Sequence, residues 1–150
     1  MDNSKTFAFA LFCAIIEIMK KKSPTYWRKK CVTLAKLEAR KRDGDKCQYC
    51  GRSKAQGYVI HGSHILPEGT YVSLSADVDN IIALCSTHHL SGANPRMGKS
   101  EPSWHSHPIL FASWFNKKFP GRYDELRKRA QKCTVVDWEK RYKEMKHGSR

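Results

Sequence analysis

Two pairs of metal-binding residues constrain what this chain can fold into more than any other feature. Cys47 and Cys50 form the first pair, and Cys85 and His88 form the second; two residues separate the members of each pair. Pairs with this spacing present their side chains from one tight turn, and thiolates together with an imidazole suit a tetrahedral Zn²⁺ ion. The sequence therefore predicts a structural zinc site that joins two distant segments of the chain.

The segment between the two pairs is too long for a zinc finger that reads DNA bases. It contains 34 residues, whereas a finger of that kind has an insert of about a dozen. An insert of this length must carry its own hairpin. The stretch 57–61 predicts a strand, the apolar stretch 81–84 a short strand or turn, and the residues from Ser86 to about Leu90 the start of a helix.

Helices are expected on both sides of this hairpin. The chain has 150 residues, which suits one domain, and its hydrophobic content of 40% allows a modest core that a structural metal would support. We therefore expect one α+β domain with four parts: an extension at 1–24, a basic helix at 25–45, a zinc-containing core at 46–100 and a helical part at 101–150. The candidate helices of the last part are 109–119, 123–132 and 135–146.

The chain carries a strong excess of positive charge, which predicts a polyanionic partner. Its 28 Lys and Arg against 14 Asp and Glu give a net charge of +14. Nucleic acid is the first candidate partner and an anionic membrane surface the second. Residues 20–46 carry a net charge of +8 and residues 117–150 a net charge of +7, whereas residues 47–116 are neutral. A neutral centre between basic flanks is typical of a cleavage site held by backbone-binding arms, and a solubilising surface is the alternative interpretation.

The remaining cysteines indicate a reduced, cytoplasmic protein. Cys13, Cys31 and Cys133 lie outside the zinc spacing and do not suggest a disulfide framework. The apolar run 6–18 is too short to span a bilayer, and it has neither the preceding charges nor the cleavage site of a signal peptide. A buried helix, an interaction helix and a true start at Met19 remain open for this run.

Three polar residues near the zinc pairs are of the types that hydrolyse a phosphodiester with one metal ion. His64 lies at a strand end, where a neutral imidazole can take a proton from the attacking water; a histidine bonded to loop carbonyls is the alternative. Asn80 is a turn-forming residue that would pin the loop orienting His64. His89 directly follows His88, and successive helical residues point about 100° apart, so one imidazole can face the zinc and the other a cleft.

The whole pattern resembles the HNH endonuclease motif on the ββα-metal fold. After the first cysteine pair come the histidine at the strand end and then Asp-x-Asp-Asn-Ile-Ile-x-Leu-Cys-x-x-His-His at 77–89. The resemblance covers roughly residues 43–99. It implies that His64 is the general base, that Asn80 holds the loop and that His89 binds a catalytic Mg²⁺ or Mn²⁺ ion. The zinc in the knuckle formed by the two pairs would then be structural.

One position departs from the family pattern. The family has Asp or His directly before the general base, where it helps to bind the metal, and this chain has Ser63 there. His61 lies two residues earlier on the same face of the strand and is the favoured replacement ligand. His105 and His107, in the loop further along the chain, are the alternatives.

The resemblance implies a metal-dependent endonuclease that acts on DNA. A weaker likeness, in His-Leu-Ser-Gly at 89–92, in Trp-His-Ser-His-Pro at 104–108 and in the segment 114–123, connects the chain with phage recombination nucleases of the NinG/Rap type, which act on branched or recombining DNA. A phage-encoded protein would work in the host cytoplasm. A non-catalytic zinc module that binds nucleic acid is the alternative, and a homodimer would bring two sites together for double-strand cleavage. The basic residues expected to contact DNA phosphates are Arg40, Lys41, Arg42, Arg96 and Lys99.

Overall fold

The structure is a computed structural model, and it describes residues 22–91, 93–94, 99–132 and 134–148. The helices in these ranges are α2 (Pro24–Arg42), α3 (Pro108–Lys118), α4 (Arg122–Gln131) and α5 (Trp138–Gly148). The strands are β1 (Ile60–His64), β2 (Ile81–Cys85), β3 (Ala93–Asn94) and β4 (Lys99–Ser100). The apolar run 6–18, Cys13, Cys133 and Arg96 lie outside the described residues.

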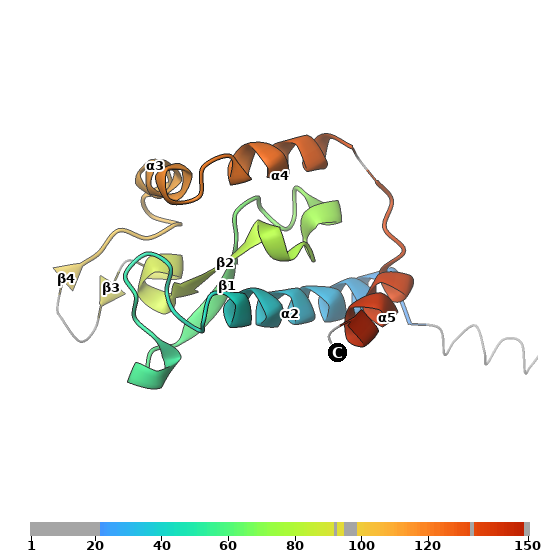
Figure 1. Ribbon diagram of the computed structural model, residues 1–150, viewed down its shortest axis with the longest axis horizontal. Coiled ribbons are helices and arrows are strands. Elements are labelled where there is room, and N and C mark those ends of the chain that lie inside the picture. Colours follow the sequence, from blue (N-terminus) through green and yellow to red (C-terminus); the bar gives the residue numbers. More distant parts are fainter. Residues whose placement is uncertain (1–21, 92, 95–98, 133, 149–150) are drawn as a thin grey trace, which may run out of the picture.

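An antiparallel hairpin of β1 and β2 forms the centre of the fold. The register pairs His61 with Leu84 and His64 with Ile81, so β1 begins and ends three residues later than the predicted strand at 57–61. All residues of β2 are buried, because helices cover both faces of the hairpin. Figure 1 shows α2 on one side and α3 with α4 on the other. The stretch 81–84 is therefore a strand rather than a turn.

Helix α2 can lie close to the hairpin because its buried face is made of small and β-branched residues. The helix begins at Pro24, and the Ser23 side chain caps it by accepting a hydrogen bond from the Tyr26 amide at 3.2 Å. Its buried face packs against Ile81 of β2 and Trp138 of α5. The residues of this face are Cys31, Val32, Ala35 and Ala39.

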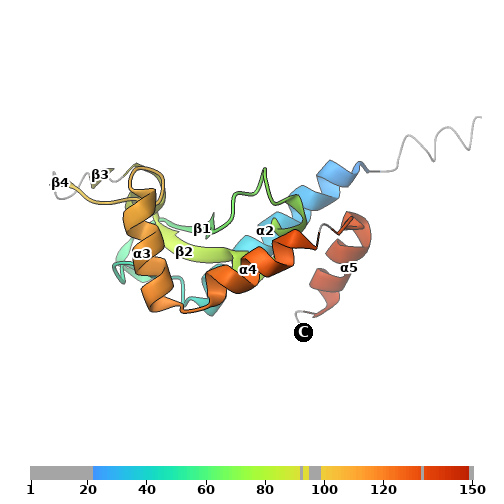
Figure 2. The same cartoon turned by 90° about the horizontal axis from the view of Figure 1, so that it is seen from above.

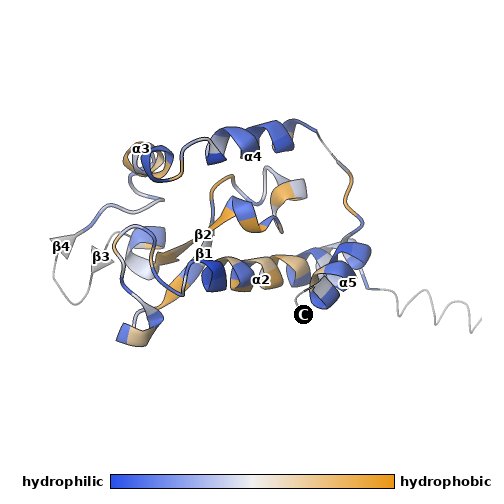
Figure 3. Ribbon diagram, viewed as in Figure 1, coloured by the Kyte–Doolittle hydropathy of each residue, from blue (hydrophilic) through white to orange (hydrophobic). Residues whose placement is uncertain are grey.

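Helices α3 and α4 cover the opposite face of the hairpin. Phe111 and Phe115 of α3 and Leu126 of α4 are buried and share one core cluster with Ile82 and Leu84 of β2. Figure 2 shows the two helices meeting at an angle. Figure 3 shows hydrophobic residues concentrated in the hairpin, whereas α4 is almost entirely hydrophilic. The core is therefore a thin layer on each side of β2.

Arginines from both helical layers hold the start of β2. Arg42 of α2 and Arg122 of α4 both donate to the carbonyl oxygen of Ile81, at 2.8 and 3.0 Å. Arg122 also donates to the carbonyl oxygen of Asp79 at 2.7 Å, and Arg42 to that of Val78 at 2.9 Å. Part of the positive charge of the flanks thus stabilises the hairpin itself.

Some elements differ in detail from the sequence-based expectation. The helix expected from Ser86 is one π-helical turn, η4 (Thr87–Ser91), and the loop expected after it contains the strand pair β3–β4. Helix α5 begins at Trp138 rather than at residue 135, because the Asp137 side chain accepts a hydrogen bond from the Lys140 amide at 3.1 Å and so caps the helix there. In the part of the chain that the structure describes, no helix has both the length and the apolar character needed to cross a membrane.

The closest approach of α2 and β1 generates a stability prediction at Gly62. A Cβ atom added there would lie 2.9 Å from Cβ and Cγ of Lys36 and 3.1 Å from Cγ2 of Ile81. These atoms lie near the backbone and cannot swing away, so Gly62→Ala should lower the free energy of unfolding by about 1–3 kcal/mol in urea titrations. Gly69→Ala is the matched control, because nothing lies within 4 Å of its added Cβ; equal losses for both variants would contradict the close packing.

Candidate active site

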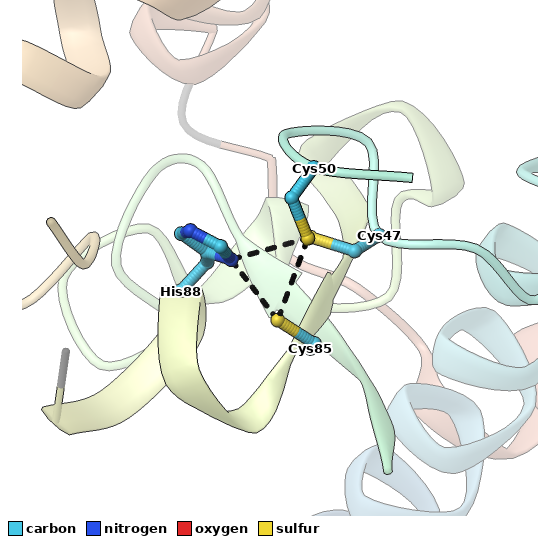
Figure 4. A group of neighbouring side chains, drawn as sticks. All are labelled: Cys47, Cys50, Cys85 and His88. Atoms are coloured by element: carbon cyan, nitrogen blue, oxygen red, sulfur yellow. Dashed lines mark hydrogen bonds between the residues drawn. The ribbon is translucent and has the colours of Figure 1, made fainter. Parts of the chain in front are cut away.

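The two predicted zinc pairs come together in the structure. The four donor atoms of Cys47, Cys50, Cys85 and His88 all lie within 4.8 Å of one another (Figure 4). The Cys50 and Cys85 sulfurs are 4.0 Å apart, and His88 Nδ1 is 3.8 Å from the Cys47 sulfur and 3.0 Å from that of Cys85. A zinc tetrahedron with Zn–S bonds of about 2.3 Å places its sulfurs about 3.8 Å apart, so the cluster has the size and the donors of a structural zinc site.

The chemistry of the cluster also suits a metal. Hydrogen bonds from the thiols of Cys47 and Cys50 lower the pKa of Cys85, which favours the thiolate form that zinc binds. The far nitrogen of His88, Nε2, lies 3.0 Å from the carboxylate of Glu101. Arg52 holds that carboxylate in turn, with contacts of 2.7 and 3.1 Å. A carboxylate behind a metal-binding imidazole fixes the tautomer and the ring orientation, here leaving Nδ1 to face the sulfurs.

A cleft of about 470 Å³ lies beside the end of β1 and η4. Its lining includes two of the predicted site residues, His64 and His89, which come from β1 and η4. A larger groove of about 590 Å³, beside α5, is lined by none of the predicted site residues. The other polar residues of the cleft are Lys36, Ser63, Glu68 and His105.

The two neighbouring histidines of η4 face different surroundings. His88 is buried with its ring directed at the sulfurs, whereas His89 contacts His61 of β1, with a distance of 5.3 Å between ring centroids. The ring of His105, from the loop before α3, lies against the other side of His89, also with centroids 5.3 Å apart. Burial and the neighbouring imidazoles lower the pKa of His89 to about 4, so the ring is neutral at physiological pH. Imidazoles from β1 and from the loop before α3 therefore both contact His89, and His89 and His105 line the cleft.

The position of His64 leaves one of its ring nitrogens free to act as a base. Its Nε2 lies 2.8 Å from the carbonyl oxygen of Ser75, and because a carbonyl only accepts, Nε2 must carry the proton. In the neutral ring Nδ1 is then the basic atom, and the Glu68 carboxylate lies 3.5 Å from it. Burial lowers the pKa of His64, which keeps the ring neutral near pH 7.

Asn80 is fully buried and joins the two ends of the loop that follows His64. Its Oδ1 accepts a hydrogen bond from the Leu66 amide at 2.8 Å, and its Nδ2 donates to the carbonyl oxygens of Leu66 and Leu74, both at 3.1 Å. The Ser75 carbonyl that binds His64 directly follows this loop end. Asn80 thus holds the backbone that orients the imidazole, and it does not line the cleft.

The residue before His64 and the second loop histidine contribute less to the cleft. Ser63 lines it but is only 2% exposed, and a hydroxyl is a poor metal ligand. His107 is exposed, and its Nδ1 lies 2.8 Å from the hydroxyl oxygen of Ser106. Of the two loop histidines that the sequence left open as ligands, His105 is therefore the one beside the imidazoles.

The predicted DNA-binding residues lie in different settings. Arg40 donates to the carbonyl oxygen of Ile60 at 3.2 Å, and Arg42 is engaged with β2 as described above. Lys41 is exposed on α2. Lys99 belongs to the short strand β4, and Arg96 lies outside the described residues. The arginines of the run 40–42 thus form contacts within the protein.

Sequence reasoning missed Lys36, Glu68 and Glu101. No spacing rule connects Glu101 with His88 or Lys36 with the hairpin, because long-range packing creates both contacts. One signal was available: residues 47–116 contain only four acidic residues. In so sparse a set, the two glutamates were candidates for specific partners.

The zinc cluster generates a prediction for metal content and stability. Cys47→Ser should remove most of the bound zinc, measured as metal per chain after gel filtration, and should lower the melting temperature, because the binding free energy of a structural zinc is also folding free energy. Cys31→Ala, which changes a buried cysteine outside the cluster, is the control and should retain about one zinc per chain. If Cys47→Ser melts like the parent, the structural role is wrong.

The comparisons with known proteins agree with this geometry. The family described as HNH endonuclease matches residues 47–91, which run from the first zinc ligand to the end of η4. No curated protein and no solved structure matches the chain. The matched segment contains the whole hairpin, the zinc cluster, His64, Asn80 and His89. Residues 47–91 therefore match the HNH endonuclease family, and the structure around them is consistent with a small α+β fold of the ββα-metal type with flanking helices.

Proposed function

We propose that this protein is a metal-dependent endonuclease that hydrolyses phosphodiester bonds of DNA. The observation that carries the proposal is the convergence of His64 and His89 on one cleft, next to a cluster that fits structural zinc. The HNH match supports a nucleic-acid substrate, and the net charge of +14 suits a polyanion.

His64 is the proposed general base. Its basic Nδ1 atom is placed to take the proton from a water molecule that attacks phosphorus. The Ser75 carbonyl, 2.8 Å from Nε2, fixes the tautomer and stabilises the imidazolium that forms. The His64 side chain is only 9% exposed, so the surrounding residues hold its ring in one orientation. Asn80 acts indirectly, by holding the loop end that carries Ser75.

His61, His89 and His105 are the proposed ligands of a catalytic divalent ion. Their donor set fits a metal, because Nδ1 of His89 is buried and has no hydrogen-bond partner among the described residues. The zinc cluster is the one described group whose donor atoms all lie within 4.8 Å, so these three side chains would have to move closer together to share an ion. A bound ion would neutralise charge on the phosphate and on the leaving oxygen. Imidazoles favour Mn²⁺ over Mg²⁺, which prefers oxygen ligands.

The second part of the proposal concerns which DNA structures the protein cleaves. The likeness of the segment 104–123 to phage recombination nucleases favours branched or recombining DNA. A panel of linear duplex, nicked duplex, fork and four-way junction, cleaved under identical conditions, tests this preference. Equal rates on all four would leave the nuclease assignment intact and remove the preference.

One observation favours a second function, a zinc module that binds nucleic acid without cleaving it. Ser63 replaces the acidic or imidazole ligand of the family, and it is almost fully buried. A plasmid-nicking assay with Mn²⁺, with Mg²⁺ and without added divalent ions separates the two functions. Binding without nicking under all three conditions would select the non-catalytic module.

The general-base role predicts both a mutational effect and a pH profile. His64→Ala should lower the cleavage rate by about 10²–10⁴-fold, and its zinc content should equal that of the parent. In the parent, kcat/KM should fall as acid protonates His64; because burial lowers the pKa of this ring from 6.5, the fall should be centred below pH 6.5. Full activity of His64→Ala would exclude the role.

The imidazole ligand set predicts how the metal requirement changes. His105→Ala should raise the Mn²⁺ concentration that gives half-maximal cleavage by about tenfold or more, and Mn²⁺ should support faster cleavage than Mg²⁺ in the parent. His107→Ala is the matched control, since His107 does not line the cleft. Equal metal requirements for the two variants would remove His105 from the ligand set.

A further inference from the structure

Glu68 lies at the cleft in contact with three groups that suit an anion. Its Oε1 is 3.6 Å from Nη2 of Arg28, and its Oε2 is 3.6 Å from Nζ of Lys36. The same Oε2 is 3.5 Å from Nδ1 of His64, the proposed base. A single carboxylate therefore occupies the space beside the atom that would activate water.

These contacts are loose, which makes the carboxylate replaceable. Distances of 3.5–3.6 Å exceed those of charge-assisted hydrogen bonds, which are about 2.7–2.9 Å. The Glu68 side chain is 33% exposed and that of Lys36 is 38% exposed, so solvent screens both pairs. A phosphodiester carries the same charge as the carboxylate and offers oxygens to the same cations.

An independent observation at Arg28 supports a larger anion. Its Nε is buried and has no hydrogen-bond partner among the described residues. A guanidinium binds a phosphate through two parallel N–H groups, whereas Glu68 engages Arg28 through Nη2 at 3.6 Å. Lys36 is held in place because its Cβ and Cγ pack on Gly62. Both cations come from α2: Lys36 lines the cleft itself, and Arg28 contacts the Glu68 carboxylate that lines it.

We propose that Arg28 and Lys36 bind the DNA phosphate next to His64, and that Glu68 occupies this phosphate site until substrate displaces it. The inference rests on the proposed function for the identity of the ligand. It differs from the expected role of the run 40–42, whose arginines contact the protein's own carbonyl oxygens.

The test measures binding rather than cleavage. Fluorescence anisotropy with a short labelled DNA duplex, in buffer without added Mg²⁺ or Mn²⁺, gives Kd for the parent and for Glu68→Gln, Arg28→Gln and Lys36→Gln. A gel shows that the duplex stays intact. Glu68→Gln should tighten binding by about two- to fivefold, as expected for removing weak competing ion pairs. Arg28→Gln and Lys36→Gln should weaken it, and each should reduce the salt slope of log K by about one.

Two comparisons separate displacement from a general charge effect. Glu38→Gln removes the same charge from an exposed position of α2, two residues from Lys36 and so about 200° around the helix; it should tighten binding less than Glu68→Gln. In the Arg28→Gln/Lys36→Gln background, Glu68→Gln should lose most of its effect, because the carboxylate no longer competes for cations. Circular dichroism melts establish that each variant is folded.

Several outcomes would overturn the proposal. One is a gain for Glu68→Gln that does not exceed that of Glu38→Gln, and another is a gain that persists in the double-variant background. Weaker DNA binding by folded Glu68→Gln would indicate that Glu68 is a binding group or a loop anchor. If Glu68→Gln does not fold, unchanged salt slopes for both Arg28→Gln and Lys36→Gln reject the proposal. A protein that binds DNA in this pattern but never cleaves it would refute the nuclease function alone.

Discussion

The gathering of three thiols and one imidazole is the constraint on which the rest of the structure depends. It joins the turn at 47–50 to the end of β2 and to the first residues of η4. Other contacts of the knuckle include the Tyr49 ring, which packs against His88 and Phe111 with centroid distances of 4.6 Å, and the hydrogen bond from the Gln48 amide to the carbonyl oxygen of Ala83. The hairpin carries His64 and leads directly into η4, which carries His89, and the cluster that fits structural zinc lies at the junction of the two.

Much of the fold and of the candidate site could be predicted from local patterns. The spacing of the cysteines identified the cluster that fits zinc, and the basic helix expected at 25–45 corresponds to α2, which begins one residue earlier and ends three residues earlier. The roles of the adjacent histidines were also separable, since His88 alone joins the cluster. The start of β1 was misplaced because the residues 57–59 look strand-like, whereas the paired register of the hairpin begins at Ile60.

Contacts between distant segments could not be predicted from the sequence. Nothing local indicates that Glu68 meets two cations of α2, that Glu101 backs His88, or that His105 reaches His89. The role of the arginines could not be predicted either. Arg42 was expected to contact DNA phosphates, yet both Arg42 and Arg122 donate to the carbonyl oxygen of Ile81 in β2. Net charge therefore overestimates the cationic surface that remains for DNA.

His88 and His89 are adjacent in the chain, so the zinc cluster and the proposed second metal site are joined by one peptide bond. The ring that belongs to the zinc cluster and the ring proposed to bind the second ion share a single π-helical turn. A displacement of the knuckle is therefore expected to reach the second ring as well. Oxidants of the thiols, or chelators that remove a bound zinc, would then act on the proposed second metal site from a distance, with Cys50, the exposed member of the cluster, as the accessible thiol.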